Sequence, residues 1–238
     1  MRAKYIHIFF DLDNTLWDFE TNSENAMKVA CLKYLPEKID FREFFETYSE
    51  INHRLWDLYR KNGITKKDLT RRRFQETFEK LDIADINPEE MNDYYLHVMP
   101  DQKLLTEGAI ELLDYLKSRF YKMAIITNGF SEVQRRKLET SGLKNYFSGV
   151  FISEEVKSPK PETAIFEHAL TSMNARKSQS IMIGDDWEVD VIGASRFGMD
   201  AVYFNRDSLK DVDIQKENPG GRTKIFKTGN LKKLLSFF

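Results

Sequence analysis

A short apolar run near the amino terminus ends abruptly in two aspartates and a threonine, and this junction constrains the fold more than any other segment. Residues 6–10 read Ile-His-Ile-Phe-Phe, and Asp11, Asp13 and Thr15 follow at alternate positions. An apolar run of this length, bounded by polar residues, predicts a buried β-strand. In an extended chain Asp11 and Asp13 point to the same side, where their charges repel unless a cation or a shared proton intervenes. The junction therefore predicts either a turn that uses Asp and Asn or a functional site at a strand end.

The composition is that of an ordinary globular protein. The 238 residues are 41% hydrophobic and 31% charged, with a formal net charge of −2. We therefore expect one or two folded domains and no bulk attraction to a nucleic-acid polymer or a membrane. Cys31 is the only cysteine, which excludes an intrachain disulfide and favours a reducing compartment. Because no stretch has the pattern of a signal peptide or a membrane span, we expect a cytoplasmic protein.

The segment after the first strand has helical periodicity and almost no strand signal. Four helices are expected here: residues 24–34 capped by Asn22 or Ser23, residues 41–62 ended by Gly63, one capped by Thr65, and one opened by Pro88. The pattern predicts an all-α domain over residues 17–100. It is inserted into a core formed by residues 1–16 and 101–238.

From residue 104 onward, helices and strands alternate. The strands are expected at 121–126, 149–152, 180–183 and 201–204, with helices at 107–118, 131–141, 161–170 and 189–197. Repeated strand–helix units predict an α/β fold with a doubly wound, parallel, Rossmann-like sheet and right-handed crossovers. We also expect a loop at 218–221, an edge strand at 223–226 and a short last helix capped by Asn230.

Polar residues gather at the ends of four expected strands or in the loops that follow. They are Asp11 and Asp13, then Thr127 and Asn128, then Lys160, and finally Asp185, Asp186 and Asp190. A parallel sheet brings the carboxyl ends of its strands to one edge, so we expect these side chains to converge. Taken singly, each group is explained by a turn, a helix start or a helix cap. Together and in this order they are strong evidence for one site.

In this order the four groups resemble the motifs of the haloacid dehalogenase superfamily: D-x-D-x-T, T-N-G, K-P and G-D-D-x-x-x-D. The helical insertion directly after the first motif resembles the type 1 cap of that superfamily, which closes over the site and selects the substrate. The segments IFFDLDNTL, NHRLWDLYRKNGIT, ITNGF and LETSGLKNYF are most similar to the house-cleaning pyrimidine 5′-nucleotidases of the superfamily. The resemblance implies a small-molecule phosphomonoester substrate, a nucleoside 5′-monophosphate with pyrimidine preferred.

The resemblance also implies catalytic roles. Asp11 would be the nucleophile that forms an aspartyl-phosphate. Asp13 would protonate the departing alkoxide and then take a proton from the attacking water. Thr127, Asn128 and Lys160 would hold the phosphoryl group, with Thr127 and Lys160 counted as catalytic.

The implied cofactor is Mg²⁺. Its ligands would be Asp11, the backbone carbonyl of Asp13, and Asp185, a set of hard oxygen donors that suits this ion. Asp186 stands where the family often has Ser or Thr. Either Asp186 or Asp190 would be a second ligand or a support outside the coordination shell.

Substrate selection is less constrained by the sequence. Trp17 and Trp56 offer aromatic faces for a base, although packing inside the helical domain explains them equally well. The run Arg71-Arg72-Arg73 predicts a solvated helix face, with Arg73 as a candidate for contacting a phosphate or ribose.

Two other functions fit parts of the pattern. A sugar-phosphate phosphatase or a phosphomutase would use the same four motifs with a different cap. A non-enzymatic phospho-acceptor switch also places Asp, Thr and Lys at strand ends, but it is usually about half this length. Carbon–halogen cleavage does not need an acid at the position of Asp13, so phosphoryl transfer is favoured. The sequence leaves the choice between monomer and homodimer open.

Overall fold

The computed structural model describes residues 4–207, 214–217 and 223–238. The chain divides into two compact units, one formed by residues 1–19 and 103–238 and the other by residues 20–102. Within the described residues, the structure contains no helix with the length and hydropathy of a membrane-spanning segment. The loop expected at residues 218–221 lies outside the described residues.

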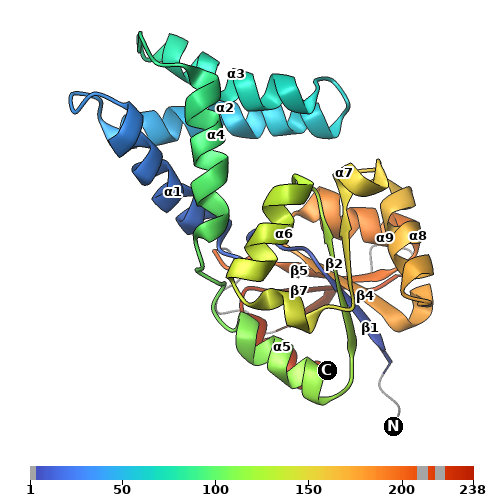
Figure 1. The fold of residues 1–238 in the computed structure, drawn as a ribbon. Helices are drawn as coiled ribbons and strands as arrows, with labels where there is room; N and C mark the ends of the chain where they lie inside the picture. The colour runs from blue at the N-terminus through green and yellow to red at the C-terminus, as the bar shows by residue number, and fades with distance from the viewer. Residues whose placement is uncertain (1–3, 208–213, 218–222) are drawn as a thin grey trace. The chain divides into compact units, whose positions relative to one another are not determined.

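The first unit is built on one mixed sheet (Figure 1). In the described part of the chain, seven strands pair in the order β3-β2-β1-β4-β5-β7-β6. They are β1 (His7–Phe10), β2 (Lys122–Thr127), β3 (Gly149–Ile152), β4 (Ser180–Gly184), β5 (Asp200–Phe204), β6 (Gln215–Glu217) and β7 (Ile225–Thr228). All neighbouring pairs are parallel except β6 with β7. The strand expected at 223–226 is present as β7, but the prediction that it lies at the edge of the sheet was wrong, because β6 pairs with the outer side of β7.

Strand β1 is central, and its register explains why the motifs meet. Phe10, its last residue, pairs with Ile125 of β2 on one side and Ile183 of β4 on the other. The chain segments that leave β1, β2 and β4 therefore emerge side by side at the carboxyl edge of the sheet. Phe9 and Phe10 are fully buried, as expected for a parallel strand whose two faces are both covered by helices.

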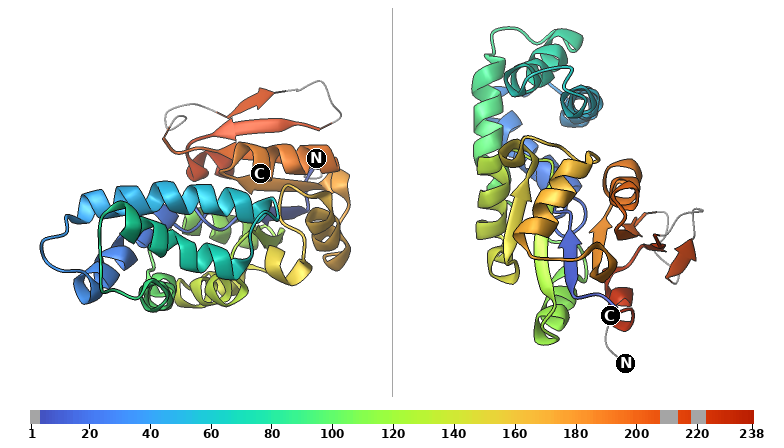
Figure 2. Two further views of the ribbon diagram at one scale, coloured as in Figure 1. Left: turned by 90° about the horizontal axis from the view of Figure 1, so that it is seen from above. Right: turned by 90° about the vertical axis from the view of Figure 1, so that its right-hand side faces the viewer.

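Helices cover both faces of this sheet, which confirms the predicted doubly wound fold (Figures 1 and 2). The helices are α5 (Ala109–Ser118), α6 (Ser131–Thr140), α7 (Ser153–Val156), α8 (Thr163–Ser172) and α9 (Gly193–Phe197), with shorter turns η2 (Leu143–Tyr146), η3 (Lys177–Gln179), η4 (Trp187–Ile192) and η5 (Leu231–Ser236). The connections that contain α5 and α6 lead from β1 toward β3 at one edge of the sheet. The connections that contain α8 and α9 lead back from β3 past β1 toward β5. Right-handed crossovers therefore place these two pairs on opposite faces. Helix η5 begins after Asn230, whose side chain accepts from the Lys232 amide, as predicted.

The second unit is helical and is inserted after the first strand. It contains α1 (Phe19–Tyr34), α2 (Phe41–Arg60), α3 (Lys66–Lys80), α4 (Pro88–Val98) and η1 (Met99–Asp101). Thr65 caps α3 in a reciprocal capping box with Asp68, and Pro88 occupies the first turn of α4, as the sequence predicts. The core of this second unit is aromatic. The Tyr48 ring centroid lies 4.9 Å from that of Phe74 and 5.8 Å from that of Tyr95.

The predicted start of α1 was wrong. The helix begins at Phe19, so Asn22 and Ser23 lie inside it rather than at its cap. Both are buried, and the Ser23 hydroxyl lies 2.8 Å from the hydroxyl of Tyr95 on α4. A buried hydroxyl with a partner within the unit can occupy a helix interior, and sequence alone does not separate this case from an N-cap.

Candidate active site

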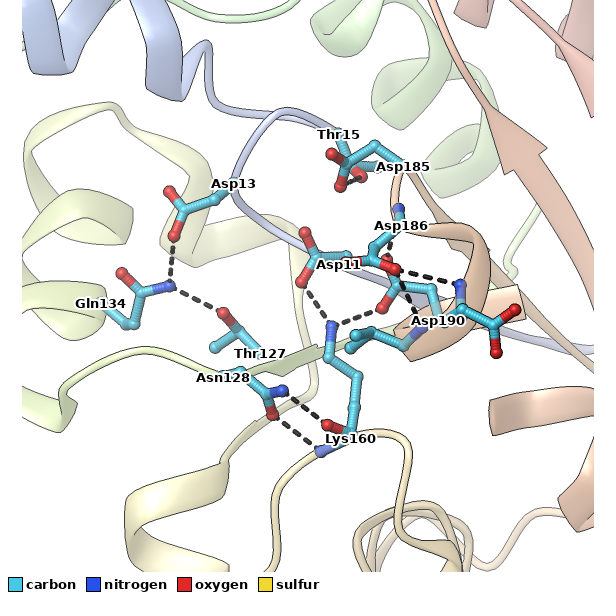
Figure 3. Close-up of polar contacts among 12 residues, drawn as sticks. Asp11, Asp13, Thr15, Thr127, Asn128, Gln134, Lys160, Asp185, Asp186 and Asp190 are labelled. Carbon is cyan, nitrogen blue, oxygen red and sulfur yellow. Dashed lines mark hydrogen bonds and ion pairs between the residues drawn. The ribbon is translucent and has the colours of Figure 1, made fainter. Parts of the chain in front are cut away.

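A tight loop follows β1 and separates the two aspartates of the first motif. The backbone amides of Leu16 and Trp17 both donate to the Leu12 carbonyl, at 3.0 and 2.9 Å. Asn14 has a φ of 57°, a left-handed conformation that Asn tolerates better than most residues. Because β1 ends at Phe10, the alternation of an extended strand does not continue through the motif. The aspartates before and after Leu12 consequently contact different partners (Figure 3).

Three carboxylates meet beside the carboxyl end of β1, and we call them the acidic cluster: Asp11, Asp185 and Asp190. Each offers an oxygen, and these oxygens all lie within 4.8 Å of one another. The Lys160 ammonium contacts two of them, at 2.5 Å from Asp11 Oδ1 and 2.6 Å from Asp190 Oδ1. The Thr15 hydroxyl donates to Asp185 Oδ1 at 3.3 Å. Residues distant in the sequence thus converge at one point, as Figure 3 shows.

Asp190 reaches the cluster because the chain after β4 forms a π-helical turn, η4, instead of the expected α-helix start. The Asp186 carboxylate caps this turn by accepting hydrogen bonds from two of its backbone amides, both at 3.0 Å. The Asp186 amide in turn donates to Asp190 Oδ2 at 3.1 Å. A Cβ at Gly184 would lie 2.2 Å from that same oxygen, so the close approach of Asp190 requires glycine there.

Burial and mutual repulsion shift the titration of the acidic cluster. Burial raises the pKa of Asp11 to about 7, against the opposing effect of Lys160. Burial and neighbouring carboxylates also raise the pKa of Asp185, while burial raises the pKa of Asp190 despite its contact with Lys160. For Lys160 burial alone would lower the pKa, but Asp11 and Asp190 outweigh it and raise it.

The donor set of the cluster fits a hard divalent cation. Three carboxylates face one ammonium in direct contact, so the buried group carries excess negative charge when it is ionised. The oxygens are close enough to share one ion, and oxygen-only coordination suits Mg²⁺. Asp186, whose carboxylate is engaged in capping η4, does not belong to this set.

Lys160 is held in place through its backbone. Its amide donates to Asn128 Oδ1, and Asn128 Nδ2 donates to the Lys160 carbonyl, both at 2.8 Å. The Asn128 amide group therefore joins the loop after β2 to the loop before α8. The Asn128 side chain thus contacts the Lys160 backbone, and the phosphate contact expected from the sequence stays a prediction.

The second aspartate of the first motif lies against helix α6. Asp13 Oδ1 is 2.6 Å from the Lys137 ammonium, and Asp13 Oδ2 accepts from Gln134 Nε2 at 2.9 Å. The same Gln134 nitrogen lies 2.7 Å from the hydroxyl of Thr127, which ends β2 and is buried. Asp13 and Thr127 are thus linked through one side chain (Figure 3).

The three residues suggested for substrate selection lie in different surroundings. Trp17 is fully buried in the first unit, with its ring 4.2 Å from the Lys137 ammonium. Trp56 is partly buried in the second unit and packs edge-on against Tyr59.

The sequence predicted a solvated helix face for Arg73, but the structure buries this residue. It is 3% exposed, and its Nε and Nη2 donate to Asn92 Oδ1 at 2.9 and 2.6 Å. Its guanidinium also lies within 6 Å of three aromatic ring centroids of the same unit.

A family model matches most of the chain. The model of the haloacid dehalogenase-like hydrolases covers residues 7–198, a span that includes all four motifs. The chain belongs to the haloacid dehalogenase-like hydrolase family.

Two curated relatives and one solved structure are similar over nearly the whole length. The pyrimidine 5′-nucleotidase YjjG of Escherichia coli is 34% identical over 85% of this chain and 87% of its own. A ribulose-1,5-bisphosphate 5-phosphatase of Halopiger xanaduensis is 30% identical over 86% and 87%. The structure of the HAD-hydrolase YfnB of Bacillus subtilis, bound to magnesium, has a TM-score of 0.83 at 22% identity and covers 99% of both chains.

Sequence reasoning gave no role to three residues of the site. Thr15 was part of the first motif, but its contact with Asp185 follows only from the loop after β1. Gln134 and Lys137 lie on the buried face of α6 beside Val133 and Leu138. A glutamine and a lysine on the apolar face of an amphipathic helix are the signal that could have found them.

Proposed function

We propose that this haloacid dehalogenase-like hydrolase is a Mg²⁺-dependent phosphatase that hydrolyses phosphomonoesters through an aspartyl-phosphate on Asp11. The observation that carries the proposal is the convergence of Asp11, Asp185 and Asp190 within 4.8 Å of one another, with Lys160 in contact. A nucleophilic carboxylate, further oxygen donors and a fixed positive charge are the groups that phosphoryl transfer to aspartate requires.

Asp11 attacks phosphorus in its ionised form. Its pKa of about 7 in the metal-free site means that added positive charge is needed to keep it fully ionised at neutral pH. Asp11, Asp185 and Asp190, with the Asp13 backbone carbonyl expected from the sequence, would hold Mg²⁺, which would supply that charge and offset the charge of the phosphoryl group. Lys160 lies 2.5 Å from the nucleophile and adds a second positive charge at the same point.

Asp13 is placed to transfer protons rather than to bind the cation through its side chain. Its carboxylate contacts Gln134 and Lys137 on α6. In Figure 3 it lies beside Gln134 and apart from the three members of the acidic cluster. In the protonated form it gives its proton to the leaving oxygen. As a carboxylate it then accepts a proton from the water that hydrolyses the acyl-phosphate.

The substrate we propose is a nucleoside 5′-monophosphate, with pyrimidine preferred. The similarity to YjjG over most of both chains supports this choice, together with the segments of the inserted unit that resemble pyrimidine 5′-nucleotidases. The inserted helical unit would act as the cap that selects the substrate. The similarity to a ribulose-1,5-bisphosphate 5-phosphatase favours a sugar phosphate as the second candidate.

A substrate panel tests the proposal. The purified chain is supplied with Mg²⁺ and offered uridine, deoxyuridine, cytidine and adenosine 5′-monophosphates, hexose phosphates and ribulose-1,5-bisphosphate, with phosphate release as the readout. We expect the pyrimidine nucleotides to have the highest kcat/KM and both EDTA and Asp11→Asn to abolish release. Faster turnover of a sugar phosphate would replace the nucleotidase assignment. A long-lived phosphorylated chain without phosphate release would indicate a phospho-acceptor switch instead.

A further inference from the structure

Helix α6 presents two buried polar side chains to Asp13, and we call Gln134 and Lys137 the Asp13 clamp. Both are 1% exposed. Lys137 Nζ lies 2.6 Å from Asp13 Oδ1, and Gln134 Nε2 donates to Asp13 Oδ2 at 2.9 Å. Each carboxylate oxygen of Asp13 thus has a donor from the same helix. Because the two donors are one helical turn apart on a rigid element, they fix the plane of the carboxylate as well as its position.

The clamp also includes the end of β2. Gln134 Nε2 carries two hydrogens, so it can donate to Asp13 and to Thr127 Oγ1, 2.7 Å away, at the same time. Because the Thr127 oxygen accepts from Gln134, its own proton remains available for a second hydrogen bond. A phosphoryl oxygen of the bound substrate would accept this second hydrogen bond. The clamp therefore sets the acid–base group and a phosphate-binding hydroxyl relative to each other.

Stability alone does not explain a lysine at this position. Lys137 Nζ lies 4.2 Å from the Trp17 ring centroid and 5.2 Å from that of Phe19, so aromatic faces enclose the ammonium. The next residue, Leu138, is buried in the same apolar face of α6. An apolar side chain at 137 would avoid the cost of removing an ion pair from water. The lysine therefore needs a reason in the chemistry of Asp13.

We propose that Gln134 and Lys137 are positioning residues that hold the Asp13 carboxylate in line with the leaving oxygen of the substrate. The inference rests on the proposed function. In the first step an Asp11 carboxylate oxygen bonds to phosphorus while the ester P–O bond breaks, the electron pair of that bond stays on the leaving oxygen, and the Asp13 proton moves to that oxygen. In the second step the oxygen of a water bonds to phosphorus, the bond between phosphorus and Asp11 breaks to give back the carboxylate and release inorganic phosphate, and one proton of the water moves to Asp13. Both transfers depend on the direction of the same carboxylate, and misdirection lowers their rates.

Leaving groups of different basicity separate positioning from a structural role. Uridine 5′-monophosphate departs as an alkoxide that needs the proton, whereas p-nitrophenyl phosphate releases a stable phenolate without one. We measure the first turnover of the full-length, Mg²⁺-supplied protein. For Gln134→Leu and Lys137→Met we expect the first-turnover rate with the nucleotide to fall by about 10–100-fold, which is part of the ~10²–10⁴-fold that acid–base catalysis supplies. With the phenyl ester we expect the rate to fall by less than about 3-fold. The substrate concentration that gives half of the maximal first-turnover rate should change little for either substrate.

Three further variants make the test specific. Lys137→Arg keeps a cationic donor and should recover most of the lost nucleotide rate. Arg135→Met is the matched control, because Arg135 is an exposed cation on the same helix that pairs with Glu155 at 2.7 Å instead of with Asp13. In an Asp13→Asn background, Lys137→Met should cause no additional loss with uridine 5′-monophosphate, since it acts through Asp13.

Equal losses with both substrates, or a full additional loss in the Asp13→Asn background, would overturn the positioning role. If the wild-type protein is active and the clamp variants have the same rates, the positioning role would be overturned as well, while the proposed function would stand. Wild-type protein that cleaves no phosphomonoester would contradict the proposed function instead. If Lys137→Met does not fold by circular dichroism, Gln134→Leu decides, because it removes the bridge to Thr127 and leaves the ion pair in place.

Discussion

Removing one charge from the acidic cluster should stabilise the metal-free protein, and Asp185→Asn is the cleanest way to do so. The amide has the shape of the carboxylate and can still accept the hydrogen bond from Thr15. Asp185 is also the member of the cluster that has no ion pair with Lys160, whose contacts are Asp11 and Asp190. The substitution therefore removes repulsion without leaving a buried ammonium unpaired.

The expected magnitude follows from Coulomb's law. Two carboxylates whose oxygens lie within 4.8 Å of each other repel by at least about 3.5 kcal/mol at an effective dielectric constant of ~20. Lys160 and bound protons offset part of this repulsion, so we expect Asp185→Asn to raise the free energy of unfolding by about 1–3 kcal/mol at pH 8 in EDTA.

The sign of the pH dependence follows from the raised pKa values. Asp11, Asp185 and Asp190 have a higher pKa in the folded than in the unfolded protein, so the folded protein binds more protons. Stability of the metal-free protein then falls as pH rises from about 4 to 7 and beyond, as each carboxyl group loses its proton in the folded protein. The advantage of Asp185→Asn should be largest at pH 8 and should shrink toward pH 4.

Urea unfolding in EDTA and in Mg²⁺ measures both effects. A ligand that binds only the folded state adds stability, so Mg²⁺ should stabilise the wild type and have much less effect on Asp185→Asn. Glu188→Gln is the matched control: this exposed carboxylate lies close in sequence, and its neutralisation should change stability by less than about 0.5 kcal/mol. A metal-free Asp185→Asn protein that is less stable than wild type at pH 8, or equally stabilised by Mg²⁺, would refute the reasoning.

Two further substitutions test parts of the structure outside the cluster. Asn128→Leu removes both 2.8 Å hydrogen bonds to the Lys160 backbone, and steady-state kinetics should record a loss in kcat of about tenfold or more. An unchanged kcat would exclude a positioning role for Asn128. Arg73→Met leaves Asn92 without its buried donor, and thermal or urea unfolding should show that the free energy of unfolding falls by about 2–4 kcal/mol. An unchanged free energy of unfolding would contradict the buried position of this arginine.

The parts of the fold that the sequence predicted correctly are those with strong local signals. The buried run before Asp11, the Thr65 capping box and Pro88 each have one favourable conformation, so local chemistry decides them. The start of α1 was missed because Ser23 has both the chemistry of a cap and a buried partner, Tyr95, that only the folded unit supplies. A tertiary contact here overrides a local preference.

The convergence of the four motifs could be expected from topology, but the partners of each side chain could not. Strand order brings Asp11 and Asp185 together without any information on side-chain direction. The π-helical turn that places Asp190 in the cluster, and the face of α6 that turns Lys137 toward Asp13, depend on packing against the sheet. Such details appear only when the elements are assembled.

The central claim is that Asp11 carries a phosphoryl group during turnover, and chemical trapping tests it most directly. An Asp13→Asn variant supplied with Mg²⁺ and p-nitrophenyl phosphate should form the acyl-phosphate and hydrolyse it slowly, because the base for the second step is absent. Borohydride reduction followed by peptide mass spectrometry should then find homoserine at position 11. Phosphate release without any modification at Asp11, or reduction at a different carboxylate, would contradict the account.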